Sequence, residues 1–255
     1  MEIFLHANTW VALLTLTFLE NILGIDNIVF ISIAAGKLKK NEVLKATRLG
    51  LLLAMLFRVL LLFGVSYLIA MKDQFYTFDL GWISAGFTGQ SVILFFGGIF
   101  LLYKSTKEIN HKIAEIDHDE ISGPKKIAST LGMVIVQIVM IDIVFSFDSV
   151  LTAVGMTNGI EGALPIMIIA VVVSILIMMI FAAPIGKFVN KHPTIQMLAL
   201  AFLILIGFML ITESAHLANA VIFNQHVGAI PKGYLYFAIA FSLGVEALNM
   251  KIRKK

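Results

Sequence analysis

Three stretches of the chain contain no Asp, Glu, Lys or Arg, and each is about long enough for a helix to cross a bilayer. They run from Leu80 to Tyr103, from Gly162 to Gly186 and from Pro193 to Thr212. A helix rises ~1.5 Å per residue and the hydrocarbon core is ~30 Å thick, so about 20 residues suffice. The 255 residues are 59% hydrophobic and 14% charged, too apolar for a soluble domain of this length. Lipid must therefore be the solvent for most of the chain.

Four further apolar runs are interrupted by only a few ionisable residues. They cover about Trp10–Ala35, Lys45–Met71, Ile127–Gly155 and Gly233–Met250. Alternating segments of about ten residues, typical of a membrane β-barrel, do not occur. The N-terminus has no basic residue before the first run, so we expect that run to be a retained helix and not a signal peptide. The sequence thus predicts an all-α membrane protein with seven transmembrane helices.

The basic residues predict the orientation of these helices. With seven spans, sixteen of the nineteen Lys and Arg residues fall in the loops and tail on one face, two (Lys72 and Lys232) fall on the other, and Arg58 lies within a span. Basic residues concentrate on the cytoplasmic side of membrane proteins. We therefore expect the N-terminus outside and the C-terminus in the cytoplasm. This asymmetry also accounts for the net charge of +3, so no nucleic-acid partner is needed.

An internal repeat links the first and fourth spans. Shifted by 122 residues, Glu20 falls on Asp142 and Asp26 falls on Asp148. Three spans separate the copies, so the copies enter the membrane from opposite sides, as in an inverted repeat. We predict one transmembrane domain over residues 1–255. It comprises a first repeat at about 8–103, a cytoplasmic loop at about 104–126, a second repeat at about 127–213 and a final helix at about 233–250.

Five acids lie within the spans, and only one base, Arg58, lies there with them. The acids are Glu20, Asp26, Asp142, Asp148 and Glu246. Because a buried charge is costly in a bilayer, one salt bridge to Arg58 would leave four acids to be protonated, hydrated or neutralised by bound cations. Acids that only hold helices together would need basic or amide partners in comparable number. Arg58 itself could move between acids or simply tie the second span to the first.

Depth places the four motif acids in a ladder, which we call the acidic ladder. Asp148 is expected nearer the outside, Glu20 and Asp142 near the centre, and Asp26 nearer the cytoplasm. Glu20 and Asp26 lie on opposing faces of a straight helix. Gly24 in the first span, and Ser146 between Asp142 and Asp148 in the fourth, could permit local unwinding that brings each pair of acids to one cavity. Gly24 could also be only a close-packing residue.

The donor atoms near these acids restrict the ion. Amide oxygens of Asn21 and Asn27 and hydroxyls of Ser146 and Ser149 join the carboxylates, and all are hard oxygen donors. Such donors suit Mg²⁺, Ca²⁺ or Mn²⁺ better than Cu⁺ or Zn²⁺. The chain has no cysteine, which excludes thiolate metal sites. Glu246 could line the inner mouth of the path or pair with nearby bases.

These motifs resemble the TerC family of membrane proteins, which includes manganese exporters of the Alx type. The likeness rests on Glu20-Asn-x-x-Gly-x-Asp-Asn27, Asp142-x-x-Phe-Ser-Phe-Asp-Ser149 and Phe241-Ser-Leu-Gly-Val-Glu-Ala-Leu-Asn249. The resemblance implies Mn²⁺ efflux across the cell membrane by a multi-pass protein, with no enzymatic activity and no resident cofactor. It implies metal binding by Glu20, Asn21, Asp26, Asn27, Asp142, Asp148, Ser149 and Glu246.

Two other functions use the same residues. An intramembrane aspartyl protease needs two facing Asp residues that share a proton, but four acids in a symmetric ladder exceed that need. A passive cation channel is the second alternative.

Exchange of the metal for protons would suit an exporter built on carboxylates, because one carboxylate can hold either a proton or the metal. No phosphate-binding Gly-x-x-x-x-Gly-Lys-Ser/Thr motif occurs, which argues against ATP hydrolysis by this chain.

Overall fold

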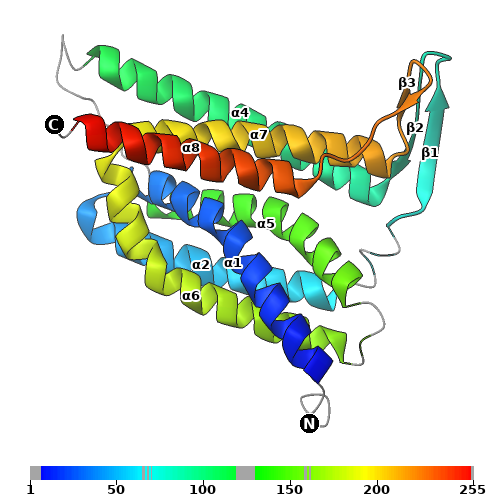
Figure 1. Ribbon diagram of the computed structural model, residues 1–255, viewed down its shortest axis with the longest axis horizontal. Helices are drawn as coiled ribbons and strands as arrows, with labels where there is room; N and C mark the ends of the chain where they lie inside the picture. The colour runs from blue at the N-terminus through cyan, green and yellow to red at the C-terminus, as the bar shows by residue number, and fades with distance from the viewer. Residues whose placement is uncertain are drawn as a thin grey trace. The chain divides into compact units, whose positions relative to one another are not determined.

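The computed structural model describes residues 7–64, 67, 69, 71–118, 130–157, 160 and 162–253, excluding the side chains of residues 7, 23, 25, 26, 40, 115–118 and 253. Most of the described chain is helical (Figure 1). The helices are α1 (Ala7–Ala35), α2 (Lys40–Phe63), α4 (Gly89–His118), α5 (Leu131–Met156), α6 (Ala163–Lys191), α7 (Pro193–Leu217) and α8 (Lys232–Arg253). The strands are β1 (Gln74–Asp79), β2 (Ile83–Thr88), β3 (Val221–Ile222) and β4 (Gln225–His226).

Six of the described helices are long and apolar enough to cross a membrane: α1, α2, α5, α6, α7 and α8. They lie where apolar runs were expected, in agreement with an all-α membrane protein. Helix α4 is long, but its uncharged part, Gly89 to Tyr103, rises only about 22 Å, less than the hydrocarbon core. Its role as a seventh span stays a prediction, and so does the orientation of the chain.

One compact unit of the chain combines Met1–Ala70 with Ala128–Lys191 and contains α1, α2, α5 and α6. Helix α1 packs mainly on α6, and α2 packs mainly on α5 (Figure 1). Small residues bring both pairs close. A Cβ added to Gly186 of α6 would lie 2.9 Å from Ser32 Oγ of α1, and one added to Gly50 of α2 would lie 2.8 Å from Ile138 Cγ2 of α5. These contacts fix the four helices around a common interior.

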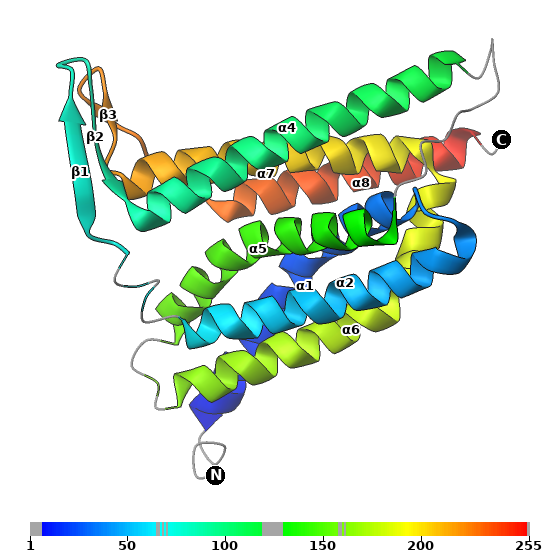
Figure 2. The same cartoon turned by 180° about the vertical axis from the view of Figure 1, so that it is seen from behind.

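The other compact unit combines Met71–Ile127 with His192–Lys255. In it α4 runs along α7 (Figure 2), and the two backbones meet at Gly98 and Gly207. A Cβ at Gly98 would lie only 2.6 Å from the carbonyl oxygen of Gly207. Further along the same contact, Ser214 Oγ donates a 2.6 Å hydrogen bond to the carbonyl of Ser91. Helix α8 packs on α7.

A small antiparallel sheet contains two strands before α4 and two after α7, and it corrects the predicted start of the third span. Residues 83–88 form β2, which pairs with β1, and the helix begins only at Gly89. The sheet order is β1-β2-β3-β4. Gly81 takes a positive φ of 80° in the β1–β2 turn, where its N–H donates to Asp79 Oδ1 at 2.8 Å. The segment from Leu80 is uncharged, but its aromatic and β-branched residues and its glycine turn favour a hairpin over a helix.

Candidate functional site

Helix α1 brings Glu20 and Asn27 to one face, because residues seven apart nearly superpose on a helix. Both are buried, each about 4% exposed. The helix is continuous from Ala7 to Ala35, so the local unwinding considered at Gly24 does not occur. A Cβ on Gly24 would instead collide with the side chain of Met178 on α6. Gly24 is therefore a packing residue that lets α1 and α6 approach closely.

Helix α5 is likewise continuous from Leu131 to Met156, so Ser146 does not mark a break. Thr130 caps its first turn by accepting a hydrogen bond from the Met133 N–H at 3.4 Å. Asp142 and Ser146 are four apart and share one buried face of this helix. Ser146 Oγ donates to Asp142 Oδ2 at 2.9 Å, which orients the carboxylate.

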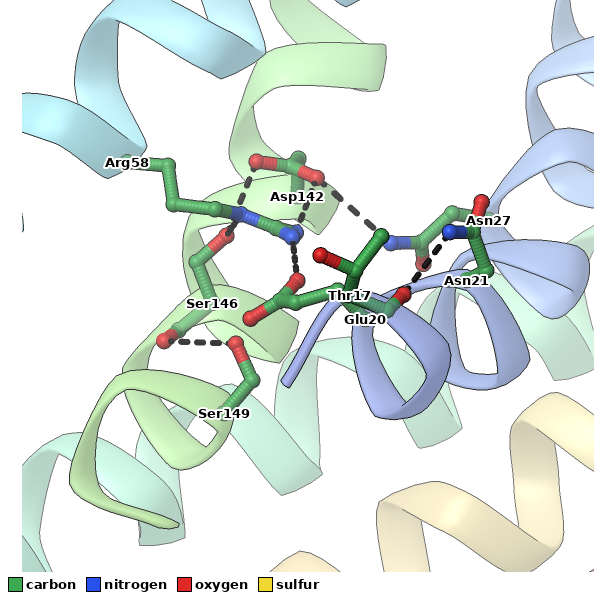
Figure 3. A network of polar contacts seen from close by, with 8 residues as sticks. All are labelled: Thr17, Glu20, Asn21, Asn27, Arg58, Asp142, Ser146 and Ser149. Atoms are coloured by element: carbon green, nitrogen blue, oxygen red, sulfur yellow. Dashed lines mark hydrogen bonds and ion pairs between the residues drawn. The ribbon is translucent and has the colours of Figure 1, made fainter. Parts of the chain in front are cut away.

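Arg58 of α2 is the centre of the polar cluster drawn in Figure 3. It is only 2% exposed, and three of its nitrogens have acceptors. Nη1 forms an ion pair with Glu20 Oε2, Nη2 reaches Asp142 Oδ1 at 2.9 Å, and Nε donates to Ser146 Oγ at 2.8 Å. The planar fork of a guanidinium suits several acceptors at once, whereas an ammonium is a point charge. Arg58 thereby ties α2 to both α1 and α5.

This geometry corrects the expected charge balance. The sequence argument counted one salt bridge to Arg58, whereas the guanidinium engages two acids, Glu20 and Asp142. Two ionised carboxylates and one guanidinium leave a net charge of −1 in a buried cluster. Breaking such a cluster by removing one partner is costly because it strands a buried charge.

Asn27 adds an unusual feature next to Asp142. Its Nδ2 lies 3.5 Å from Asp142 Oδ1, a long hydrogen bond (Figure 3). Its Oδ1 is buried and has no hydrogen-bond partner within the described residues. A buried polar atom without a partner is rare and often marks a place where a water or an ion belongs. Asn27 thus presents a hard oxygen acceptor beside a carboxylate.

The remaining predicted site residues are less closely assembled. Ser149 Oγ donates to the Ser146 carbonyl at 3.2 Å, one turn beyond the cluster. Asn21 Nδ2 donates to the Thr17 carbonyl at 2.7 Å, which gives this amide a local structural role. Asp148 is half-buried on α5.

Two predicted acids cannot be compared with the cluster. The side chain of Asp26 lies outside the described residues. Glu246 is half-buried on α8, in the other unit. Within the described side chains, no group of three or more Asp, Glu, His or Cys residues could by itself hold a metal ion. The predicted metal-ligand set therefore stays a prediction.

Sequence reasoning named Ser146 and Arg58 but missed how the two residues connect the cluster. Ser146 was considered as a hydroxyl donor, but not as the residue that links Asp142 to Arg58. Arg58 was expected to serve one acid, although the sequence held a signal for two. Glu20 and Asp142 were predicted at the same depth, and only one base was available near them.

Comparison with known proteins identifies the family of the chain. The integral membrane protein TerC family matches residues 5–254. The UPF0053 inner membrane protein YgdQ of Escherichia coli K12 is 44% identical over 248 residues, covering 97% of this chain and 95% of the relative. A UPF0053 protein of Haemophilus influenzae is 43% identical over 245 residues, covering 96% and 94%.

A further relative is longer. The UPF0053 inner membrane protein YoaE of Escherichia coli K12 is 42% identical over 254 residues, which is all of this chain but 45% of the relative. The chain thus spans a little less than half of that protein. No solved structure matches. The apolar helices and the inner-membrane relatives make this a multi-pass protein of the cell membrane. The chain belongs to the TerC family of integral membrane proteins.

Proposed function

We propose that the protein is a transporter that exports a hard divalent cation, Mn²⁺ in the first place, from the cytoplasm. The observation that carries the proposal is the buried cluster of Glu20, Asp142 and Asn27, contributed by α1 and α5. It combines two carboxylates with an amide oxygen that lacks a partner among the described residues. Carboxylate and amide oxygens are the ligands that Mg²⁺, Ca²⁺ and Mn²⁺ prefer.

The net charge of the cluster supports a cation and argues against an anion. With Arg58 included, the cluster carries −1 when all three groups are ionised, and a low-dielectric surrounding strengthens its attraction for a positive ion. Asp148 and Asp26, on the same two helices, would extend the acidic ladder toward the two membrane faces. An ion would then move from one acid to the next along α1 and α5.

The pairing of the helices favours an alternating-access transporter rather than a channel with a fixed pore. In an inverted repeat of three helices plus three, α1 corresponds to α5 and α2 corresponds to α6. Exchanging these helices converts the α1–α6 contact into the α5–α2 contact, and both contacts occur. Repeats of this kind are common in secondary transporters, with the ion site near the pseudo-two-fold axis. A transporter without enzymatic activity follows from this proposal.

The proposal is tested by ion flux into proteoliposomes that hold the purified protein, with Mn²⁺, Ca²⁺, Mg²⁺ and Zn²⁺ compared. Glu20→Gln and Asp142→Asn keep the side-chain size and remove the charge. We expect saturable, Mn²⁺-selective flux that falls by roughly ten- to one-hundredfold or more in both variants, because even outer-shell changes cost this much in metal sites. Asp73→Asn, at an exposed acid between α2 and β1, is the matched control and should transport normally.

Three outcomes would contradict the proposal. Normal flux in both variants would mean that the buried acids serve only packing. Flux that does not saturate would indicate a passive channel. Absence of divalent-ion flux in the unmodified protein, together with cleavage of a membrane-embedded peptide, would favour the aspartyl protease.

A further inference from the structure

Arg58 occupies the carboxylate oxygens that a transported cation would need. Its Nη1 engages Glu20 Oε2, and its Nη2 engages Asp142 Oδ1 at 2.9 Å. Building on the cation-export function proposed above, we propose that Arg58 is an internal competitor of the cation. The guanidinium holds the two carboxylates when the site is empty, and it releases them when the cation binds.

Geometry supports competition at the same atoms. Asp142 Oδ2 is already taken by Ser146 Oγ at 2.9 Å, so Oδ1 is the oxygen of this carboxylate that can change partner. Oδ1 is also the oxygen next to Asn27, whose amide oxygen has no hydrogen-bond partner in the described chain. A cation bound by Glu20 and Asp142 would need the carboxylate oxygens that the two Nη atoms now contact (Figure 3).

Charge supports mutual exclusion. With both carboxylates ionised and Arg58 in place the cluster would carry −1, so a divalent ion bound beside the guanidinium would leave a net charge of +1 in a buried site. Withdrawal of the guanidinium from the two acids leaves the ion and the carboxylates balanced at zero. Like charges at contact distance repel strongly where the dielectric constant is low. The ion and the guanidinium are therefore expected to alternate.

The test measures equilibrium Mn²⁺ binding to the purified full-length protein and Mn²⁺ flux in proteoliposomes. Arg58→Gln removes the competing charge and should bind Mn²⁺ about tenfold more tightly or better, the range expected when a charged hydrogen-bonded partner is removed. Its flux should be slower than that of the unmodified protein. Arg58→Lys keeps the positive charge, so its affinity for Mn²⁺ should be closer to that of the unmodified protein than the affinity of Arg58→Gln is.

A second variant guards against misfolding of Arg58→Gln. Ser146→Ala removes the acceptor of Arg58 Nε and the donor to Asp142 while leaving every charge in place. We expect it to bind Mn²⁺ several-fold more tightly because Arg58 is held less firmly. Ser214→Ala removes another buried serine hydroxyl, in the α4–α7 contact, and should leave affinity unchanged.

The outcomes separate this inference from the proposed function. If the unmodified protein neither binds nor transports a divalent ion, cation export itself is wrong. If it transports Mn²⁺ but folded Arg58→Gln and Ser146→Ala bind Mn²⁺ equally or more weakly, Arg58 is a structural tie and not a competitor.

Discussion

The amide of Asn27 shows how one residue can reveal a site. Its Nδ2 has a long hydrogen bond to Asp142, whereas its Oδ1 is buried without a partner in the described chain. Folding alone gains little from such an atom, because an unsatisfied buried acceptor costs about 1–3 kcal/mol. The carbonyl oxygen is therefore better explained by a ligand than by stability.

This difference can be measured with Asn27→Ala. We expect Mn²⁺ affinity to fall by about tenfold or more, while thermal stability changes little or rises because an unsatisfied acceptor is removed. Asn190→Ala is the comparison, because Asn190 Nδ2 donates to the Ser32 carbonyl at 3.3 Å and supports the α1–α6 contact. It should lower the melting temperature and leave affinity unchanged. An Asn27→Ala protein with unaltered affinity would show that the amide is no ligand.

The contacts of Arg58 show which features of the cluster could be predicted from the sequence and which could not. The predicted depth of Glu20 and Asp142 is consistent with their shared contact to Arg58, because helical rise converts position along the chain into depth. The double engagement of Arg58 depends on the approach of α2 to α1 and α5 and on the reach of a long side chain. Neither can be predicted from the residues near Arg58 in the sequence, so the sequence argument counted one acidic partner for Arg58 where the structure has two.

At the scale of helices, the contact between α4 and α7 is set by two glycines. A Cβ added to Gly98 would lie 2.6 Å from the backbone carbonyl oxygen of Gly207. Unlike a flexible side chain, this carbonyl cannot rotate away. The segments Gly98-Ile-Phe-Leu-Leu and Gly207-Phe-Met-Leu-Ile resemble each other in sequence, and each begins with one of these two glycines. The paired glycines meet each other where the two helices cross.

Gly98→Ala should consequently force α4 and α7 apart. We expect a loss of about 1–3 kcal/mol in the free energy of unfolding, the usual cost of overpacking. Gly244→Ala on α8 is the matched control, since a Cβ there meets nothing within 4 Å. It should be neutral or stabilising by up to about 1 kcal/mol, because alanine favours a helix over glycine. Equal melting temperatures for the two variants would show that the close approach is absent.

The elements were predicted unevenly from the sequence, for a physical reason. Helices α5 to α8 begin and end within a few residues of the expected apolar runs, because hydropathy alone decides where a chain can enter lipid. The β1–β2 hairpin was missed because absence of charge was taken as evidence for a helix. The features that favour this hairpin are a glycine, which takes a positive φ in the turn, and a cluster of aromatic residues. These features determine the backbone conformation and are not detected by hydropathy.

For the whole molecule, the number of crossings decides the orientation of the repeat. If α4 spans, residues just before β1 and residues near the end of α4 face opposite sides of the membrane. If α4 does not span, they face the same side, and the two halves can no longer be inverted copies. The predicted distribution of basic residues requires the first arrangement.

The absence of native cysteine makes this directly testable. Asp73→Cys and Lys107→Cys introduce single thiols at exposed positions on either side of the apolar part of α4. In intact cells, a membrane-impermeant maleimide should label residue 73 and not residue 107, and both should react after the membrane is opened. Labelling of both in intact cells, or of neither, would contradict the seven-span topology.

The link between Arg58 and Glu20 also bears on how the chain enters the membrane during synthesis. These residues belong to the first two helices and lie 38 positions apart, whereas Asp142 follows Arg58 by 84 positions. The ribosome delivers Glu20 and Arg58 well before Asp142. The first helical hairpin can then partition into lipid as a neutral pair, which is far less costly than inserting two separate charges. When α5 is inserted, the guanidinium is already in the bilayer. Asp142 and Ser146 then allow α5 to pack beside the first two helices by binding this guanidinium.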